Sequence, residues 1–392
     1  MQNKLLKLMM VFILTSLISP SFGQVLVVPQ RINLPKDSLL TKQLLSSLNG
    51  FLSQKEQPAA KNEFILKENL LETAALMDEM RGMEQNIKLQ NKDFYKCYLS
   101  NVVVLNDDDF IVQLNYLGVM EGSPVLRASF KLLAKKKADK FYFYSPLKYN
   151  TNNWKLKTID HTTYHFKNTL NKVDVREYQK TVNFYDHKLK APVTLTEFYY
   201  GDNITEVLQL IGVDYKLDYN GTRDNNLTAH EDNISLILNG WSSNEHKFDP
   251  HDLWHDRLRT VLNNDIINRA VDEGCAYLYG GSWGLTWTQV FTSFTTFATA
   301  HPDANWEALY IASENYTNGN KPLKVTYAIN ALVVEDIEKK KGFNAVMTLL
   351  ACGKRENGDA NYFNTLEKIT GVNRSNFNSY VLKLLMQHKN IK

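Results

Sequence analysis

The chain has 392 residues, of which 44% are hydrophobic and 22% are charged, and its formal net charge at pH 7 is +3. This composition is typical of a globular protein, and the length is sufficient for two domains of ordinary size. The small net charge excludes the strongly basic surface typical of nucleic-acid binding, so we expect no nucleic-acid partner.

The N-terminus has the pattern of a secretory signal. Lys4 and Lys7 provide positive charge around a mostly apolar run, 5–18, which is too short to cross a membrane. Small residues at Ser21 and Gly23 indicate cleavage after Gly23. We therefore predict a signal peptide over residues 1–23 and a secreted or periplasmic protein. No later stretch approaches about 20 apolar residues, so we expect no membrane span.

Residues 24–170 are predicted to form an N-terminal α+β domain, whose function the sequence does not indicate. Leucines recur at helical spacing over 38–52, and a second helix is expected over 66–83. The pattern then changes to the alternation of strands. The expected strands are 93–105, 110–120, 125–133, 141–145 and 153–158. Two helices followed by these strands predict an antiparallel sheet that packs on a helix pair.

One histidine pair lies at the end of this domain. His161 and His165 are four residues apart in a β-prone run, where both would lie on one face of a strand. The sequence places no carboxylate where it would be recognised as a partner of these histidines, so we interpret the pair as having a structural or surface role.

Residues 171–392 are predicted to form a second, mostly helical domain. Expected elements are helices 174–188 and 204–211, strands 193–199 and 234–238, and a helical tail after residue 287. The loop 239–250, which contains Trp241 and His246, is a candidate lid. The Gly/Trp-rich stretch 280–287 is either the border of a substrate groove or the core of a turn.

The most informative stretch is Asp249-Pro250-His251-Asp252-Leu253-Trp254-His255. On a helix, His251 and His255 lie one turn apart on the same face, where both imidazoles can bind one Zn²⁺ ion. Glu273 stands 18 positions after His255, at the expected start of another helix, and is the candidate third ligand. Gly274 and Ala276 are small, so we expect them to let this helix approach the first one closely.

This pattern resembles the gluzincin zinc metallopeptidases, in particular the peptidase MA-like group. Their pattern is His-Glu-x-x-His, a gap of similar length, and then a Glu followed by Gly and a small residue. The resemblance covers the second half of the chain. It implies a gluzincin-like domain over 171–392, Zn²⁺ held by His251, His255 and Glu273, and a peptide or protein substrate hydrolysed by a zinc-bound water.

The sequence departs from the family at one position, where Asp252 replaces the Glu that acts as general base in the family. Asp252 is then the candidate catalytic residue, with a side chain one methylene shorter. The family also uses a Tyr or His to stabilise the oxyanion. Tyr277, Tyr310 and Tyr327 are available for this role.

Other interpretations of the same residues stay open. Asp249 is typical of a helix N-cap, and Pro250 is typical of the first helical position. Asp252 then lies at the third position, where the interaction of an acidic side chain with the helix dipole stabilises the helix. The domain would then be a catalytically impaired binding module with a peptidase fold. A third possibility is a cell-envelope interaction protein in which the N-terminal domain binds the partner.

The three cysteines are Cys97, Cys275 and Cys352, too few for a disulfide scaffold. Cys275 lies near Glu273 in sequence, but its helical setting favours a packed core thiol over a nucleophile.

Overall fold

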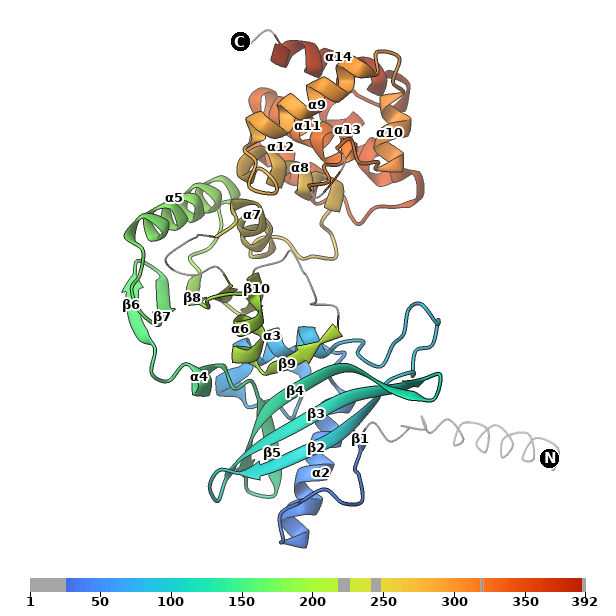
Figure 1. The fold of residues 1–392 in the computed structure, drawn as a ribbon. Coiled ribbons are helices and arrows are strands. Elements are labelled where there is room, and N and C mark those ends of the chain that lie inside the picture. The colour runs from blue at the N-terminus through green and yellow to red at the C-terminus, as the bar shows by residue number, and fades with distance from the viewer. Residues whose placement is uncertain (1–25, 218–225, 241–247, 318, 320, 390–392) are drawn as a thin grey trace, which may run out of the picture. The chain divides into compact units, whose positions relative to one another are not determined.

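The computed structural model describes residues 26–217, 226–240, 248–317, 319 and 321–389 (Figure 1). The expected signal peptide and most of the expected lid, including Trp241 and His246, lie outside these ranges. The chain forms two compact units. The sheet unit comprises Met1–Lys167 and Leu195–Gly240, and the helical unit comprises Asn168–Thr194 and Trp241–Lys392. These units divide the chain differently from the expected domains, because residues 195–240 belong with the N-terminal part.

The sheet unit contains all the named strands of the described ranges. Its helices are α2 (Ser38–Ser53), α3 (Leu70–Met80), α4 (Leu147–Asn150) and α6 (Ile204–Ile211). Its strands are β1 (Leu26–Val27), β2 (Lys96–Val104), β3 (Asp109–Met120), β4 (Ser123–Lys137), β5 (Lys140–Tyr144), β6 (Lys155–Ile159), β7 (Thr162–Phe166), β8 (Leu195–Tyr200), β9 (Val213–Lys216), β10 (Asn226–Glu231) and β11 (Ile234–Asn239).

In the first sheet, β2 to β5 form the expected antiparallel meander, and β1 pairs with β2 in parallel. The order of this sheet is β1-β2-β3-β4-β5, and β9 adds to β4. The last expected strand, 153–158, is β6 and belongs to the second sheet. Every second residue of β3 from Phe110 to Gly118 is buried, as the alternating sequence predicts. The two-residue turn Glu121-Gly122 joins β3 to β4, with both residues at positive φ, the conformation that matches the twist of a hairpin.

The second sheet has the order β10-β11-β8-β7-β6. β8 pairs in parallel with both β7 and β11, and the crossover from β7 to β8 passes through α5 (Lys172–Leu189) of the helical unit. The strand expected at 234–238 is therefore interior, because β10 covers one side and β8 the other. It cannot offer a free edge to a peptide. The prediction missed β10 because its sequence, Asn-Leu-Thr-Ala-His-Glu, is as polar as a loop.

The α+β fold class is confirmed. Of the expected helix pair, α2 packs on β5 of the first sheet, whereas α3 packs mainly on β10 of the second sheet. Asp37 caps α2 through its side chain, which accepts from Leu39 N at 2.8 Å. Leu44, Leu48 and Phe51 of α2 are fully buried in the same core as the strands. Burial of each such side chain contributes roughly 1.5–3 kcal/mol, so this apolar face holds the helix on the sheet.

The helical unit has only helices as named elements in its described part. They are α5, α7 (Pro250–Arg259), α8 (Arg269–Gly280), α9 (Trp287–Ala300), α10 (Trp306–Ala312), α11 (Val325–Lys341), α12 (Phe343–Leu350), α13 (Ala360–Thr370) and α14 (Arg374–Lys389). α11 is buried around most of its circumference from Val325 to Ile337, which is the pattern of a central helix. It packs against α8, α9, α10, α12 and α14.

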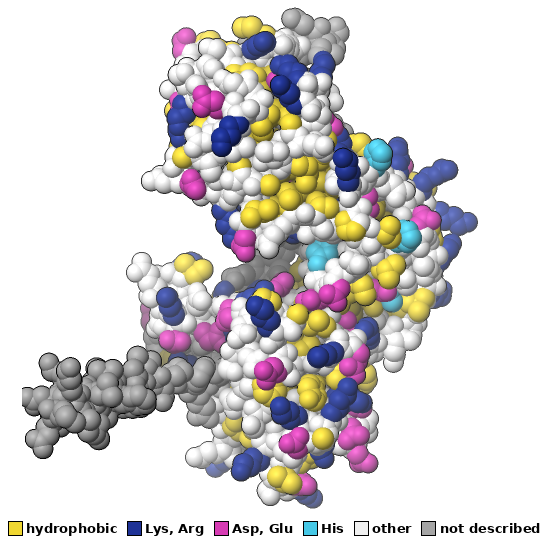
Figure 2. All heavy atoms as spheres, turned by 180° about the vertical axis from the view of Figure 1, so that it is seen from behind, with side chains coloured by type: hydrophobic (Ala, Val, Ile, Leu, Met, Phe, Trp, Pro, Cys, Tyr) yellow, Lys and Arg dark blue, Asp and Glu magenta, His cyan; other side chains and the backbone are white. Residues whose placement is uncertain are grey.

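Lys/Arg and Asp/Glu side chains are intermixed over the face shown in Figure 2, in keeping with the small net charge. In the described part of the chain, none of the helices is both long and apolar enough to cross a membrane.

Candidate metal centre

α7 brings the two predicted histidine ligands together. The side chain of Asp249 accepts from His251 N at 2.9 Å, and Pro250 occupies the first position, so the helix starts where the sequence predicts. His251 therefore lies in the first turn and His255 one turn later. The regular helix ends at Arg259.

α8 provides the third candidate ligand, but from a different position in the helix than expected. The helix begins at Arg269, and Asn268 caps it by accepting from Val271 N at 3.4 Å. The expectation that Glu273 opens this helix is therefore wrong. Glu273 lies in the second turn, where its side chain is buried beside α7.

The three side chains form a group that could hold a metal ion, with one ligand atom from each within 4.8 Å of the others. The two Nε2 atoms are 3.2 Å apart, and Oε2 of Glu273 lies 3.5 Å from Nε2 of His251 and 4.0 Å from that of His255. Two ligands about 2.0–2.1 Å from a tetrahedral centre are separated by about 3.3 Å. The spacing therefore fits a small tetrahedral cation.

Hydrogen bonds from the far side of each ring aim both Nε2 atoms at this point. Nδ1 of His251 lies 2.7 Å from the carbonyl oxygen of Gly281, and Nδ1 of His255 lies 2.8 Å from Oδ1 of Asp272. Both partners can only accept, so each Nδ1 carries a proton, and a ring in its neutral form has its lone pair at Nε2. Such outer partners are the usual support of histidine ligands in metal sites.

Asp272 is itself held in place, because Nε1 of the buried Trp254 donates to the same Oδ1 at 3.1 Å. Sequence reasoning did not single out Asp272, Trp254 or Gly281. The position of Asp272 next to Glu273 was visible, but a neighbouring position in a helix points about 100° away, and only the packing of α8 on α7 turns both carboxylates toward the histidines.

The electrostatics match a site that attracts positive charge. Burial lowers the pKa of His251, but the hydrogen bond and charge of Glu273 outweigh burial and raise that pKa to about 9. Burial raises the pKa of Glu273, whereas His251, His255 and Arg269 together bring it below its usual value. Without a metal ion, a proton takes the place of the cation between these groups.

The tyrosines named as oxyanion candidates lie at different distances from the group. The Tyr277 ring is 5.9 Å from that of His251, and Tyr327 stands edge-on to Tyr277 at 5.6 Å. Tyr310 is fully buried in a separate aromatic cluster, where it stacks on Tyr362 and accepts from Asn330, so it cannot serve the site.

Asp252 is exposed in the first turn of α7. Asp252 follows His251 in the chain, and its charge contributes to the raised pKa of His251. It also occupies the third helical position, where a negative charge interacts favourably with the helix dipole. Both interpretations made from the sequence therefore stay compatible with its location.

Close contact between α7 and α8 depends on a different glycine from the one expected. A Cβ on Gly280 would lie 2.6 Å from His251 N and 2.7 Å from Pro250 O, so only glycine allows this crossing. A Cβ on Gly274 would instead meet Asn330 at 2.4 Å. Gly274 thus allows the close approach of α11, and the expectation that it allows the close approach of α7 is wrong.

The Gly/Trp-rich stretch after α8 contributes one tryptophan to a core and another to a cavity. Trp283 packs in a small core and donates from Nε1 to Pro322 O at 3.0 Å. Trp287 and Gly281 line a cavity of about 280 Å³, together with Pro250, the residue before His251. The cavity therefore adjoins the backbone that carries the ligand group.

Cys275 is buried and its thiol pKa is raised well above the usual value by burial, as expected of a core thiol.

Comparison with models of protein families and with curated proteins finds no match for this chain.

Proposed function

We propose that this chain is a zinc metallopeptidase-like protein that hydrolyses peptide bonds. The observation that supports the proposal is the group of two Nε2 atoms and one carboxylate oxygen at tetrahedral spacing, with both rings oriented by acceptors behind them. Imidazole and carboxylate are the ligand types found in catalytic zinc sites, which keep the fourth position for water or substrate. The geometry supports the metal site, and the sequence resemblance to gluzincins is the reason for proposing peptide-bond hydrolysis as the reaction.

In this proposal His251, His255 and Glu273 hold Zn²⁺. When bound, the ion supplies a Lewis acid that polarises a carbonyl and lowers the pKa of water. Asp272 and the Gly281 carbonyl keep the two rings in the ligand tautomer. Asp252 takes a proton from the attacking water and passes it to the leaving amine nitrogen. The cavity beside Pro250 and Trp287 receives a side chain of the peptide.

Metal analysis of the purified full chain tests the first step. We expect about one zinc per chain in the wild type and loss of zinc in His255→Ala. His187→Ala removes an exposed imidazole from the same unit and should keep the metal. Absence of zinc from the wild type after incubation with the metal, or retention by His255→Ala, would contradict the proposal.

A peptide-library assay tests the reaction. Asp252→Asn should lower the hydrolysis rate about 10²-fold or more, as expected for loss of a general base, and Asp252→Glu should raise it. Asp303→Asn, which neutralises another exposed carboxylate of the same unit, should leave the rate unchanged. Equal rates in all variants would show that Asp252 takes no part in the reaction.

A second candidate function is a metal-containing binding module without turnover. The observation that favours it is the exposed position of Asp252 in the first turn of α7, where its helical role alone accounts for an acid. Bound zinc with no hydrolysis in either the wild type or Asp252→Glu would select this candidate.

The proposed location is secreted or periplasmic, and its support is the N-terminal sequence pattern alone. N-terminal sequencing of the protein from its native host should read Gln24 as the first residue. An intact Met1 would contradict the location.

A further inference from the structure

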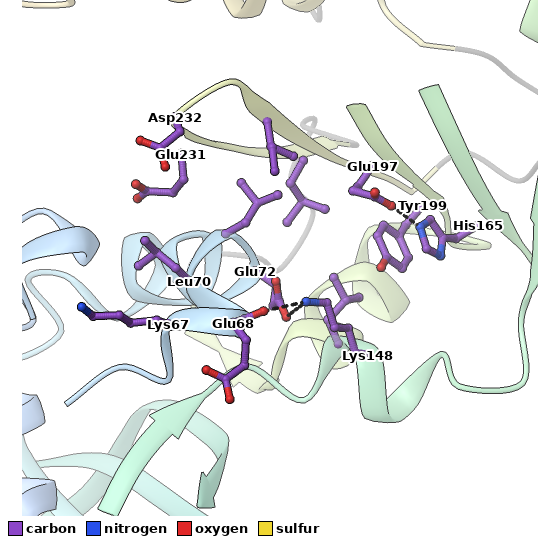
Figure 3. Close-up of a pocket in the computed structure, with 14 residues that line it drawn as sticks. Lys67, Glu68, Leu70, Glu72, Lys148, His165, Glu197, Tyr199, Glu231 and Asp232 are labelled. Carbon is purple, nitrogen blue, oxygen red and sulfur yellow. Dashed lines mark hydrogen bonds and ion pairs between the residues drawn. The ribbon is translucent and has the colours of Figure 1, made fainter. Parts of the chain in front are cut away.

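The sheet unit contains a cavity of about 420 Å³ that shares no residue with the metal group (Figure 3). α3 and the short helix α4 form one side, and β7, β8 and the β10–β11 hairpin form the other. Its volume lies within the range of small-molecule sites.

Five aliphatic side chains line this cavity. Leu70, Leu71 and Leu147 come from the helices, and Ile234 and Leu236 come from β11. A ligand must therefore have an apolar body to displace water from these surfaces.

The charged lining is mostly acidic, because five of the lining residues are carboxylates and two are lysines. Three of the carboxylates have a basic partner. Glu72, which is buried, pairs with Lys148 at 2.9 Å, Glu68 pairs with Lys137 at 3.0 Å, and Glu197 contacts His165 at 2.5 Å. The other two stand together at the β10–β11 turn.

Glu231 and Asp232 form this acidic end. Within the described ranges, no basic side chain forms an ion pair with either of them. Burial raises the pKa of Glu231, and the neighbouring charges of Asp232 and Asp78 raise it further, while His230 offsets these effects only in part. Glu231 is partly buried and Asp232 is exposed. The repulsion between these two neighbouring charges costs free energy that a bound cation would relieve.

The opposite end of the cavity is an aromatic and acidic wall. The His165 ring stacks on Tyr199 with centroids 3.8 Å apart, and Glu197 lies against His165. Figure 3 shows Glu231 and Asp232 on one side and Glu197, Tyr199 and His165 on the other, with aliphatic side chains between them. A carboxylate beside an aromatic ring is a suitable environment for an ammonium group.

We propose that this cavity binds an alkyl diamine or polyamine. One ammonium group contacts Glu231 and Asp232, the methylene chain lies on Leu70, Leu71 and Ile234, and the second ammonium group contacts Glu197 beside Tyr199. The acidic excess disfavours an anionic ligand, and a neutral apolar ligand would leave the two carboxylates at the turn uncompensated.

Calorimetric titration of the full chain with 1,5-diaminopentane tests the ligand class. We expect saturable binding that weakens as salt is added, because added ions screen the charge pairs. 1-Aminopentane, with one ammonium group, should bind about tenfold more weakly, as loss of one charged hydrogen bond predicts. Pentanoate, an anion of similar length, should not bind. Absence of diamine binding, or equal affinity for pentanoate, would overturn the proposal.

Glu231→Gln/Asp232→Asn tests the place of binding, and Asp107→Asn/Asp108→Asn is the matched control. The control removes the same charge from an exposed turn outside the cavity. The first variant should lose about tenfold or more in diamine affinity, and the control should keep it. Thermal unfolding checks that both variants fold. If the first variant does not fold, the ligand series on the wild type decides, and equal affinity of two folded variants would refute the site.

Discussion

Asp272 shows how a single residue can support a site without contacting its centre. Its Oδ1 accepts from His255 and from Trp254, so one carboxylate orients a ligand ring and is itself held by a buried indole. Replacement of outer partners of this type commonly costs about 10–100-fold in metal affinity. The support for the centre therefore extends beyond its three ligands.

We predict that Asp272→Asn lowers zinc affinity about 10–100-fold, because an amide bonds the His255 Nδ1 proton less strongly than a carboxylate does. Competition with a zinc chelator measures this loss. Asp303→Asn, a change of the same kind at an exposed site, should not alter affinity. Unchanged affinity in Asp272→Asn would show that the hydrogen bond does not support the ligand.

Glu231 leads to a prediction on pH and stability. Its pKa is raised in the folded state by burial and by the charges of Asp232 and Asp78, only partly offset by His230. A carboxyl of this kind favours folding when protonated, below its unfolded pKa, and loses that contribution as pH rises through its folded pKa. The charged form is therefore unfavourable at neutral pH.

Glu231→Gln should accordingly stabilise the protein at pH 7, by less than about 1 kcal/mol because solvent screens this partly exposed group. The gain should disappear below about pH 3.5, roughly one unit under the ordinary Glu pKa, where the wild-type carboxyl is protonated in both states. Chemical unfolding of both proteins at the two pH values measures the difference. A gain that is equal at both pH values would point to a cause other than charge.

At the scale of elements, the candidate metal centre depends on how α7 is held by α5 as well as by α8. Arg257 of α7 is buried and forms two bonds with Asp186 of α5, from Nε at 2.6 Å and from Nη2 at 3.0 Å. Tyr185 of α5 also donates to Pro250 O at 3.0 Å. These contacts anchor the helix that carries both histidines.

We predict that Asp186→Ala destabilises the protein by about 3–5 kcal/mol, because it leaves the guanidinium of Arg257 buried without its charge partner. Denaturant unfolding measures this change. Glu177→Ala, on an exposed position of the same helix, should cost no more than about 0.5 kcal/mol. A small effect of Asp186→Ala would mean that water reaches Arg257 in place of the lost partner.

At the scale of the whole molecule, the proposed metal ion belongs to one of the two compact units. All three ligands and their outer partners lie in the helical unit, whereas the diamine cavity lies in the sheet unit. A ligand that binds only the folded state stabilises the structure that forms its site. The two sites should therefore respond to separate ligands.

We predict that zinc at 100 times its dissociation constant adds about 2.7 kcal/mol to the stability of the helical unit. Hydrogen exchange with and without a chelator should show the added protection in α7 and α8, and little change in β2–β5. His255→Ala should show no added protection. Protection spread evenly over both units would contradict a localised metal effect.

Local sequence patterns determined much of what the structure shows. Alternation in 110–120 and leucine spacing in 38–52 predict their elements, because each has one face in the core. The caps Asp37 and Asp249 likewise mark helix starts, since a side-chain oxygen satisfies free backbone N–H groups at that point. The same helical period placed His251 and His255 on one face.

Only the tertiary structure decided which groups meet. The order of strands, the return of 195–240 to the N-terminal unit, the pairing of His165 with Glu197 and the support of His255 by Asp272 all join residues distant in sequence. The sequence suggested Glu273 as a ligand, but packing made its distance to the histidines 3.5 and 4.0 Å. The physical reason is that periodicity tells which face of an element is apolar, whereas the partner of that face depends on how all the elements pack together.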